Sequence, residues 1–159
     1  MNREILFRGK PDIDQEWLDE MDFTLDEYMQ SLVSVNYKDG FVYGQLVYSG
    51  KQPYIVGEVV ESTDEWITLE YWIPVKPETV GQYTGLEDKN GVEIYEGDVV
   101  RDKWNNQYTP VFRNGTYMAL NVEYLHLAKQ EPSTQFNVVW LNGCEVVGHI
   151  HDNPELLEV

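Results

Sequence analysis

The residues best spaced for metal chemistry lie near the C-terminal end of the sequence. His149 and His151 alternate along a predicted strand, so their side chains would share one face, and Asp152 follows directly. With His126 or Cys144 as a further ligand, such a set would bind zinc and support a metal-dependent hydrolase. No Cys-x-x-Cys or His-Glu-x-x-His motif accompanies it. Solvated or hydrogen-bonded histidines are therefore the preferred interpretation, and no metal or other cofactor is predicted.

Other catalytic motifs are missing from the sequence. It contains no Gly-x-x-x-x-Gly-Lys-[Ser/Thr] phosphate loop, no Gly-x-Gly-x-x-Gly and no Gly-x-Ser-x-Gly elbow. Cys144 is the single cysteine and has no neighbouring motif that would activate it, which favours an inert, buried or half-buried thiol. No catalytic residue and no enzymatic activity are predicted.

Acidic side chains greatly outnumber basic ones. There are 28 acidic and 11 basic residues, which gives a formal net charge of −17. We expect this surface to repel nucleic acids and anionic membranes, because binding them requires clustered Lys and Arg. Two interpretations of the charge stay open: solubility, which is preferred, and imitation of DNA at the basic site of a host protein. No segment reads as a membrane span or signal peptide, so a cytoplasmic location is expected.

An acidic helical segment is predicted at residues 12–35. Between residues 12 and 27 there are eight carboxylates and no basic residue, while apolar residues recur at helical spacing. One helix is expected at about 13–21 and a second at about 25–35. The pair would be either a lid that packs on a β core or a partner-binding surface. The acidic candidates for that surface are Asp19, Glu20, Asp26 and Glu27.

Local signals predict where these two helices begin. Asp12 or Asp14 would cap the first helix, because a side-chain carboxylate there accepts from the free backbone N–H groups. Thr24 and Glu27 match a capping box for the second helix.

From Phe41 onward the hydrophobic period changes to two, which is typical of β-strands. Strands are expected at 41–48 and 54–60, joined by a hairpin loop. A further strand is expected at 66–73, ended by Pro74. Its core face would comprise Ile67, Leu69, Tyr71 and Ile73.

Trp66 and Trp72 fall on the opposite face of this third strand. Either a second layer or the helical lid covers them, which is the preferred interpretation, or they are exposed at an interface. They complete the candidate interaction surface.

Sequence motifs that predict turns recur through the rest of the chain. Asp88-Lys89-Asn90-Gly91 has Asp first and Gly fourth, as a type I turn prefers. Asn114-Gly115 predicts a hairpin in which Phe112 lies opposite Tyr117. Asn142-Gly143 predicts a second hairpin between 136–141 and 144–150, in which Leu141 would pair with Cys144 and Val139 with Val146. A last helical turn is expected at Asn153, with Pro154 at its first position.

These motifs resemble the YopX family of phage and prophage proteins. The segments that carry the resemblance are Phe7-Arg8-Gly9-Lys10, Tyr43-Gly44-Gln45-Leu46-Val47, residues 83–100, Glu145-Val146-Val147-Gly148 and Asn153-Pro154-Glu155-Leu156-Leu157. The resemblance implies an SH3-like small β barrel or roll, a phage or prophage origin, self-association and no assigned enzymatic activity. Two features depart from the family: the acidic helical segment is an addition, and His149, His151 and Asp152 stand where Asn, Tyr and Glu are more usual.

Together these features predict a mainly β, β-rich α+β protein built from antiparallel hairpins. It would be a single domain over 1–159, with the acidic insertion at 12–35 and a β core at 41–151. The predicted function is that of a non-enzymatic accessory protein that contacts other proteins and forms a homo-oligomer through apolar strand edges or through Trp66 and Trp72. A DNA-mimicking inhibitor of a basic host protein is the alternative, and a metal-dependent hydrolase is the lesser alternative.

Overall fold

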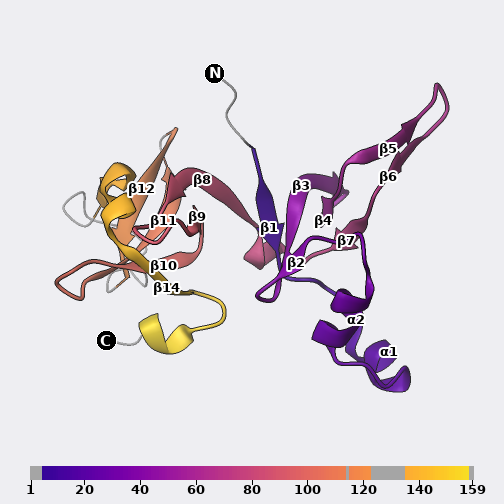
Figure 1. Ribbon diagram of the computed structural model, residues 1–159, viewed down its shortest axis with the longest axis horizontal. Coiled ribbons are helices and arrows are strands. Elements are labelled where there is room, and N and C mark those ends of the chain that lie inside the picture. The colour runs from indigo at the N-terminus through magenta and orange to yellow at the C-terminus, as the bar shows by residue number, and fades with distance from the viewer. Residues whose placement is uncertain (1–4, 114, 123–134, 158–159) are drawn as a thin grey trace. The chain divides into compact units, whose positions relative to one another are not determined.

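Two compact units make up the computed structural model, which describes residues 5–113, 115–122 and 135–157 (Figure 1). The N-terminal unit comprises residues 5–81, and the C-terminal unit begins at Gln82. This boundary falls inside the predicted β core of 41–151, so the helical segment and the first part of that core form one unit. The single domain over 1–159 stays a prediction.

An antiparallel sheet forms the base of the N-terminal unit. Its strands are β1 (Phe7–Gly9), β2 (Tyr37–Lys38), β3 (Phe41–Ser49), β4 (Gln52–Val56) and β7 (Trp72–Pro74). The order within this unit is β7-β4-β3-β1, and β2 also pairs with β3. A short 3-10 helix, η1 (Pro77–Thr79), ends the unit.

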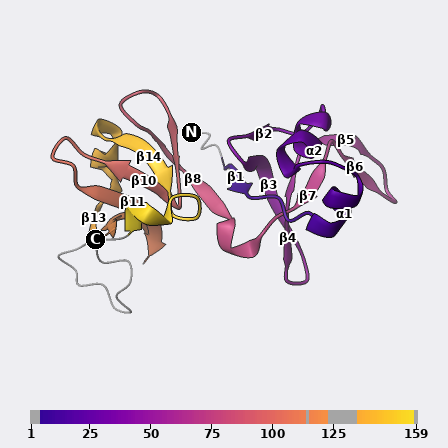
Figure 2. The same cartoon turned by 90° about the horizontal axis from the view of Figure 1, so that it is seen from below.

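The two predicted helices are present as α1 (Gln15–Glu20) and α2 (Leu25–Ser31), seen from a second side in Figure 2. Asp14 caps α1, because its Oδ1 accepts from the Trp17 N–H at 2.9 Å. The capping box of α2 is also present. Helix α2 ends at Ser31 rather than near residue 35. Among the described residues, no helix is long and apolar enough to cross a membrane.

Helix α2 packs on the sheet as a lid. Its Met29 is fully buried and belongs to a cluster with Val42 of β3, Ile55 of β4 and Ile73 of β7. The eight carboxylates of residues 12–27 are all exposed. Leu18 and Met29 of the helical segment are buried and its acidic side chains lie in solvent, as an amphipathic pattern predicts. Trp17, Met21 and Phe23 nevertheless remain exposed.

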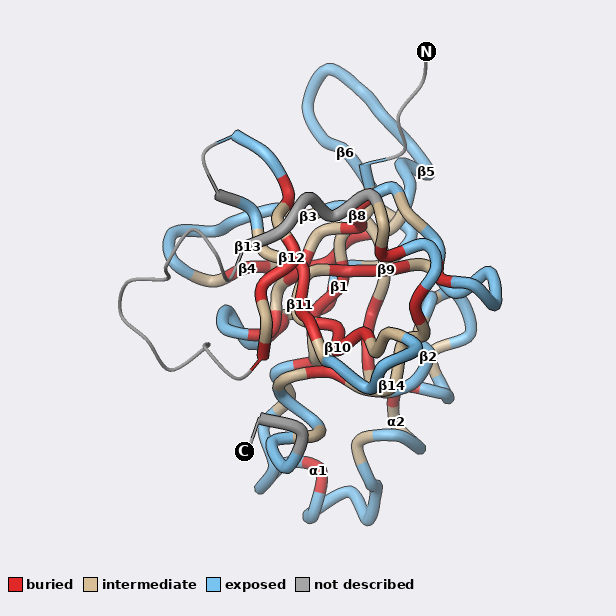
Figure 3. The backbone as a smooth tube through the Cα atoms, turned by 90° about the vertical axis from the view of Figure 1, so that its left-hand side faces the viewer, coloured by how far each residue is buried: buried red, intermediate tan, exposed pale blue. Residues whose placement is uncertain are grey.

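Strands β5 (Val59–Ser62) and β6 (Ile67–Leu69) form a separate two-stranded ribbon. The ribbon extends away from α1 and α2 (Figure 1), and it is largely exposed (Figure 3). The prediction of one strand at 66–73 is wrong, because the chain breaks between β6 and β7. Ile67, predicted to be in the core, is 62% exposed.

The break has a physical cause at Gly57, where the partner strand also ends. The ring of Tyr71 occupies the space that a Cβ of Gly57 would take, with Cε1 only 2.7 Å from that position. The Tyr71 hydroxyl donates to the backbone oxygen of Tyr43 at 2.6 Å. The segment after β4 and the segment before β7 therefore both leave the sheet beside Gly57. The residues beyond this point do not contact the core.

In the C-terminal unit the strands are β8 (Gly81–Glu87), β9 (Glu93–Tyr95), β10 (Asp98–Arg101), β11 (Gln107–Arg113), β12 (Thr116–Asn121), β13 (Gln135–Asn137) and β14 (Glu145–His149). Strands β8 and β9 form a hairpin, and the five-stranded sheet has the order β13-β12-β11-β10-β14. Phe112 lies opposite Tyr117, as predicted. Asn114 of that predicted turn lies outside the described residues.

The predicted hairpin at Asn142-Gly143 is wrong. Residues Val138–Gly143 form a 3-10 helix, η4, and β14 pairs with β10 instead. The helical turn places Leu141 in the core and packs the ring of Trp140 edge-on against Tyr108, with centroids 4.7 Å apart. The final 3-10 turn, η5 (Pro154–Leu157), begins with proline as predicted.

The turn at Asp88 is present and has a wider structural role. The Gly91 N–H donates to the Asp88 backbone oxygen at 3.0 Å, and Gly91 has a φ of 80°. The buried Asp88 carboxylate accepts from the N–H groups of Asn90, Val92 and Val146 at 2.7, 3.0 and 2.9 Å. One side chain thus closes its own loop and holds the distant strand β14.

The prediction of a mainly β protein with antiparallel sheets is confirmed. Among the described residues, the strand pairing does not close either sheet into a barrel. The SH3-like closure stays a prediction.

Candidate protein-interaction surface

The histidines of the metal hypothesis form a local hydrogen-bonded turn. His149, at the end of β14, accepts at Nδ1 from the His151 N–H at 3.3 Å, and its Nε2 lies 2.5 Å from Asp152 Oδ2. His149 is buried, whereas His151 is exposed. This arrangement agrees with the hydrogen-bonded interpretation. Within the part of the chain that the structure describes, no three His, Cys, Asp or Glu residues are grouped to hold a metal ion; His126 lies outside that part.

Cys144 is poorly suited to nucleophilic chemistry. Its side chain is buried in the core of the C-terminal unit. Burial raises the pKa of its thiol, and the negative charge of Asp102 raises it further. Because the thiolate is the reactive form, the structure agrees with the prediction of an inert thiol.

The four acidic candidates lie on the two helices and are all exposed. Asp19 and Glu20 lie at the end of α1, where Asp19 Oδ1 accepts from Gln15 Nε2 at 2.8 Å. Asp26 and Glu27 lie in the first turn of α2. The structure thus places them in two pairs on neighbouring helices.

Glu27 and Asp26, like Asp19, have hydrogen-bonding partners within the fold. The backbone N–H of Thr24, and then its hydroxyl, lower the pKa of Glu27 by donating to its carboxylate. Asp26 accepts from the Tyr37 hydroxyl. Burial raises the pKa of Tyr37, and the hydrogen bond to Asp26 raises it further. Any test that neutralises these carboxylates should therefore preserve their hydrogen-bonding atoms.

Trp66 and Trp72 are exposed, so the preferred interpretation that they are covered is wrong. Trp66 precedes β6 in the ribbon, and its backbone N–H donates to the Thr63 hydroxyl at 3.1 Å. Trp72 begins β7 and stacks on the ring of Tyr54, with centroids 5.4 Å apart and an interplanar angle of 24°. They are exposed because one lies on the ribbon beyond the core and the other lies on the sheet face opposite buried Ile73.

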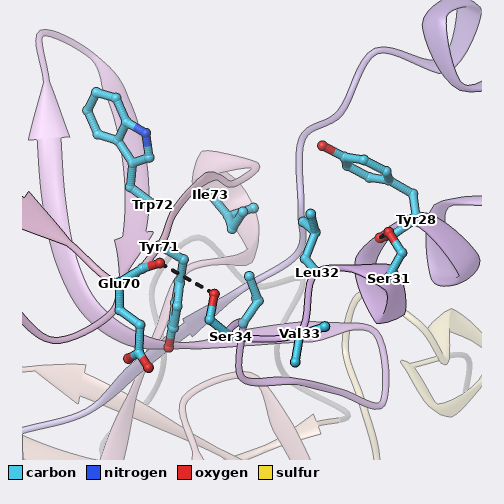
Figure 4. Close-up of a pocket in the computed structure, with 10 residues that line it drawn as sticks. Tyr28, Ser31, Leu32, Val33, Ser34, Glu70, Tyr71, Trp72 and Ile73 are labelled. Atoms are coloured by element: carbon cyan, nitrogen blue, oxygen red, sulfur yellow. Dashed lines mark hydrogen bonds between the residues drawn. The ribbon is translucent and has the colours of Figure 1, made fainter. Parts of the chain in front are cut away.

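A groove in the N-terminal unit lies between the chain that enters β7 and the segment that follows α2. It has a volume of about 580 Å³. Figure 4 shows its two walls, one from the end of α2 and the residues after it, the other from the chain that enters β7. The lining residues are Tyr28, Ser31, Leu32, Val33, Ser34, Val35, Glu70, Tyr71, Trp72 and Ile73.

A hydrogen bond links the two walls of the groove, and some of its apolar side chains are open to solvent. The Ser34 hydroxyl donates to the Glu70 backbone oxygen at 3.4 Å, which joins the walls (Figure 4). Ile73 is buried beneath the groove, whereas Val33 is 98% exposed and Trp72 is 65% exposed. We call this feature the α2–β7 groove.

The sequence interpretation missed the α2–β7 groove because it extended the second helix to residue 35. If the helix reached residue 35, Val33 would lie in its last turn and would be part of the lid. The chain instead leaves the helix after Ser31, and residues 32–35 form a turn in which the Val35 N–H donates to the Leu32 backbone oxygen at 3.1 Å. The β-branched Val33 and Val35, which favour strands over helices, were the available signal.

Comparison with known proteins identifies the family of this chain. The crystal structure of protein EF1440 from Enterococcus faecalis is similar to it at 24% sequence identity, covers 72% of this chain and 86% of that one, and gives a TM-score of 0.44. No curated protein matches the chain. The family model described as YopX protein matches residues 6–158, nearly the whole length. The chain therefore belongs to the YopX family.

Proposed function

We propose that this YopX-family protein is a non-enzymatic accessory protein of a phage or prophage, which acts in the bacterial cytoplasm through protein contacts and self-associates. The observation that carries the proposal is the exposed apolar surface of the β5–β6 ribbon. Val59, Val60, Trp66 and Ile67 all lie on this ribbon and are each more than half exposed. Exposed apolar side chains gathered on one element can mark a protein contact.

The ribbon is suited to self-contact because it is independent of the core. None of its residues belongs to the buried cluster of the N-terminal unit. Tryptophan, valine and isoleucine side chains can pack against the same residues of a second copy, as in an isologous interface. Burying them would remove apolar surface that the single chain leaves in water.

Light scattering after size exclusion tests self-association directly. Wild-type protein at about 100 µM should elute as an oligomer, whereas the double variant W66S/I67S should elute as a monomer. W104S is the control, because Trp104 is also an exposed tryptophan and lies on a turn of the C-terminal unit. A monomeric wild-type protein would contradict the proposal, as would equal effects of the two changes.

The proposal includes an SH3-like small β barrel or roll. Its support lies in the C-terminal unit, where β10, β11 and β12 are consecutive antiparallel strands and β14 returns to pair with β10. Short antiparallel strands that return to an earlier strand are typical of small closed β folds. An experimental structure in which β13 and β14 remain at separate edges would rule out closure.

A DNA-mimicking inhibitor is the second candidate function. The observation that favours it is the exposure of all eight carboxylates of residues 12–27, with no basic residue among them. Such a surface would attract a basic DNA-binding site on a host protein.

Neutralising four carboxylates tests charge mimicry. The variant D19N/E20Q/D26N/E27Q keeps the side-chain shapes, and Gln at position 27 is compatible with a capping box. Charge mimicry predicts that this variant loses capture of a host DNA-binding protein from lysate and that high salt also abolishes capture. Capture that survives both changes would exclude it.

A further inference from the structure

The lining of the α2–β7 groove is mainly apolar and includes no basic residue. Seven of its ten residues are aliphatic or aromatic: Tyr28, Leu32, Val33, Val35, Tyr71, Trp72 and Ile73. The polar remainder is two serines and Glu70. The Ser31 and Ser34 hydroxyls donate to backbone oxygens of the walls themselves. An occupant would therefore meet apolar side chains and one carboxylate.

Both chain segments that lead into the groove are acidic. Residues 12–27, which precede Tyr28, contain eight carboxylates and no Lys, Arg or His. Residues 58–70, which precede Tyr71, contain five carboxylates and again no basic residue. All thirteen are exposed. The groove thus has an acidic segment at each wall.

Three of these carboxylates are tied most directly to the groove. Glu70 lines it, and the Glu70 N–H donates to the backbone oxygen of Glu58 at 2.8 Å, which places Glu58 beside it at the base of the ribbon. Glu27 immediately precedes Tyr28 in α2. Negative charge therefore belongs to both segments that build the walls, and it acts on an approaching partner over a screening length of about 10 Å.

We propose that the α2–β7 groove binds a basic amphipathic segment of a partner protein, whose apolar side chains enter the groove while its Lys or Arg side chains meet the acidic walls. The inference rests on the proposed function in protein contacts and adds the chemistry of the partner. The volume of about 580 Å³ has room for several apolar side chains and lies within the ordinary range for binding pockets. Helix-in-groove recognition joins apolar anchors and complementary charge in this way.

Charge distinguishes this occupant from a second copy of the chain. The exposed apolar ribbon of a second copy also contains Glu61, Asp64 and Glu65. These carboxylates would face the acidic walls, and like charges brought together at an interface are unfavourable. A basic segment has the opposite charge and the same apolar contacts.

A small molecule fits the groove less well than a chain segment does. Val33 and Trp72 are mostly exposed, so a small ligand would remain largely in water, whereas binding sites for small ligands bury most of the ligand surface. The hydroxyls of Ser31 and Ser34 are engaged by the walls and offer little to orient such a ligand.

Calorimetry with two designed peptides tests the proposal on the full chain. The first probe is a 14-residue amphipathic peptide of lysine and leucine, and the second has glutamate at every lysine position. The lysine peptide should bind the wild-type protein, and the glutamate peptide should bind at least tenfold more weakly. Equal binding of the two peptides, or no binding of the lysine peptide, would overturn the proposal.

Matched valine variants locate the binding surface. V33K adds a positive charge at the rim of the groove, at a side chain that is 98% exposed, so the fold should be unaffected. V92K adds the same charge at an exposed valine of the C-terminal unit. V33K should weaken binding of the lysine peptide at least tenfold, and V92K less than twofold. Equal losses would show attraction by net charge alone and would reject the groove.

A parallel measurement keeps the two proposals separate. The ribbon variant W66S/I67S should bind the peptide like wild type, because it leaves the groove lining unchanged. A monomeric wild-type protein that binds the peptide through Val33 would reject self-association alone. An oligomeric protein that does not bind it would reject the groove alone.

Discussion

Asp88 shows how a single carboxylate can hold several parts of a fold together. Both of its oxygens accept backbone hydrogen bonds, two from its own loop and one from Val146 of β14. Burial alone would raise the pKa of this carboxyl, but the donors Val146, Val92 and Asn90 outweigh burial and lower the pKa. The ionised carboxylate is therefore the form that the folded protein stabilises.

D88A should destabilise the protein by about 3 kcal/mol, because three backbone N–H groups would lose a charged acceptor in a buried place. The free energy of unfolding in urea measures the effect. E87A removes the same charge at the adjacent exposed position and should change stability by less than about 0.5 kcal/mol. Equal effects of the two changes would show that only the charge matters.

The stabilisation by Asp88 should also depend on pH. Because its pKa in the folded protein lies below the value of about 3.9 for the unfolded chain, the ionised form contributes fully above that pH. The contribution is lost as pH falls through the folded pKa. The difference in unfolding free energy between wild type and D88A should therefore be smaller near about pH 3 than at about pH 7. A difference that grows on acidification contradicts this assignment.

At the scale of elements, signals confined to a few residues were reliable. The capping box at Thr24 and Glu27, the turn at Asp88 and the pairing of Phe112 with Tyr117 all occur as predicted. Each depends on neighbours in sequence. The strand at 66–73 and the hairpin at Asn142-Gly143 failed, because packing of Tyr71 on Gly57 and burial of Leu141 depend on distant residues.

The β5–β6 ribbon should be removable without loss of the fold. The backbone of Glu58 and Glu70 is hydrogen-bonded across its base, so replacing residues 59–69 by Asn-Gly would close a two-residue hairpin. Stability should change by no more than about 1 kcal/mol, because no ribbon residue belongs to the buried core. Chemical denaturation measures this change. Light scattering on the same protein should show a monomer, and an unfolded product would show that the ribbon is structural.

At the scale of the whole molecule, the charge of −17 acts on every association. Self-association brings acidic surfaces together, whereas a basic peptide meets opposite charge at the α2–β7 groove. Salt weakens both kinds of electrostatic interaction, since the screening length falls from about 10 Å at 0.1 M to about 3 Å at 1 M.

The two associations should therefore respond to salt in opposite ways. Raising NaCl from about 0.05 to about 0.5 M should tighten self-association by screening repulsion and weaken lysine-peptide binding by screening attraction. Sedimentation equilibrium measures self-association, and calorimetry measures binding of the lysine peptide. Potassium chloride at the same ionic strengths is the control for ion-specific effects. A common direction for both associations would show that charge does not distinguish the two surfaces.

The sequence by itself determined the β-rich class, both helix starts, most turns, the acidic exposed surface and the family. These follow from local propensity, short-range hydrogen bonds and hydrophobic period, all of which act between neighbours in sequence. Only the tertiary structure decided that the chain forms two compact units, that Trp66 and Trp72 are exposed, and that residues 32–35 and the chain entering β7 form the walls of a groove. Those features depend on which side chains, far apart in sequence, pack together and exclude water. The pattern of a single sequence does not specify these packing partners.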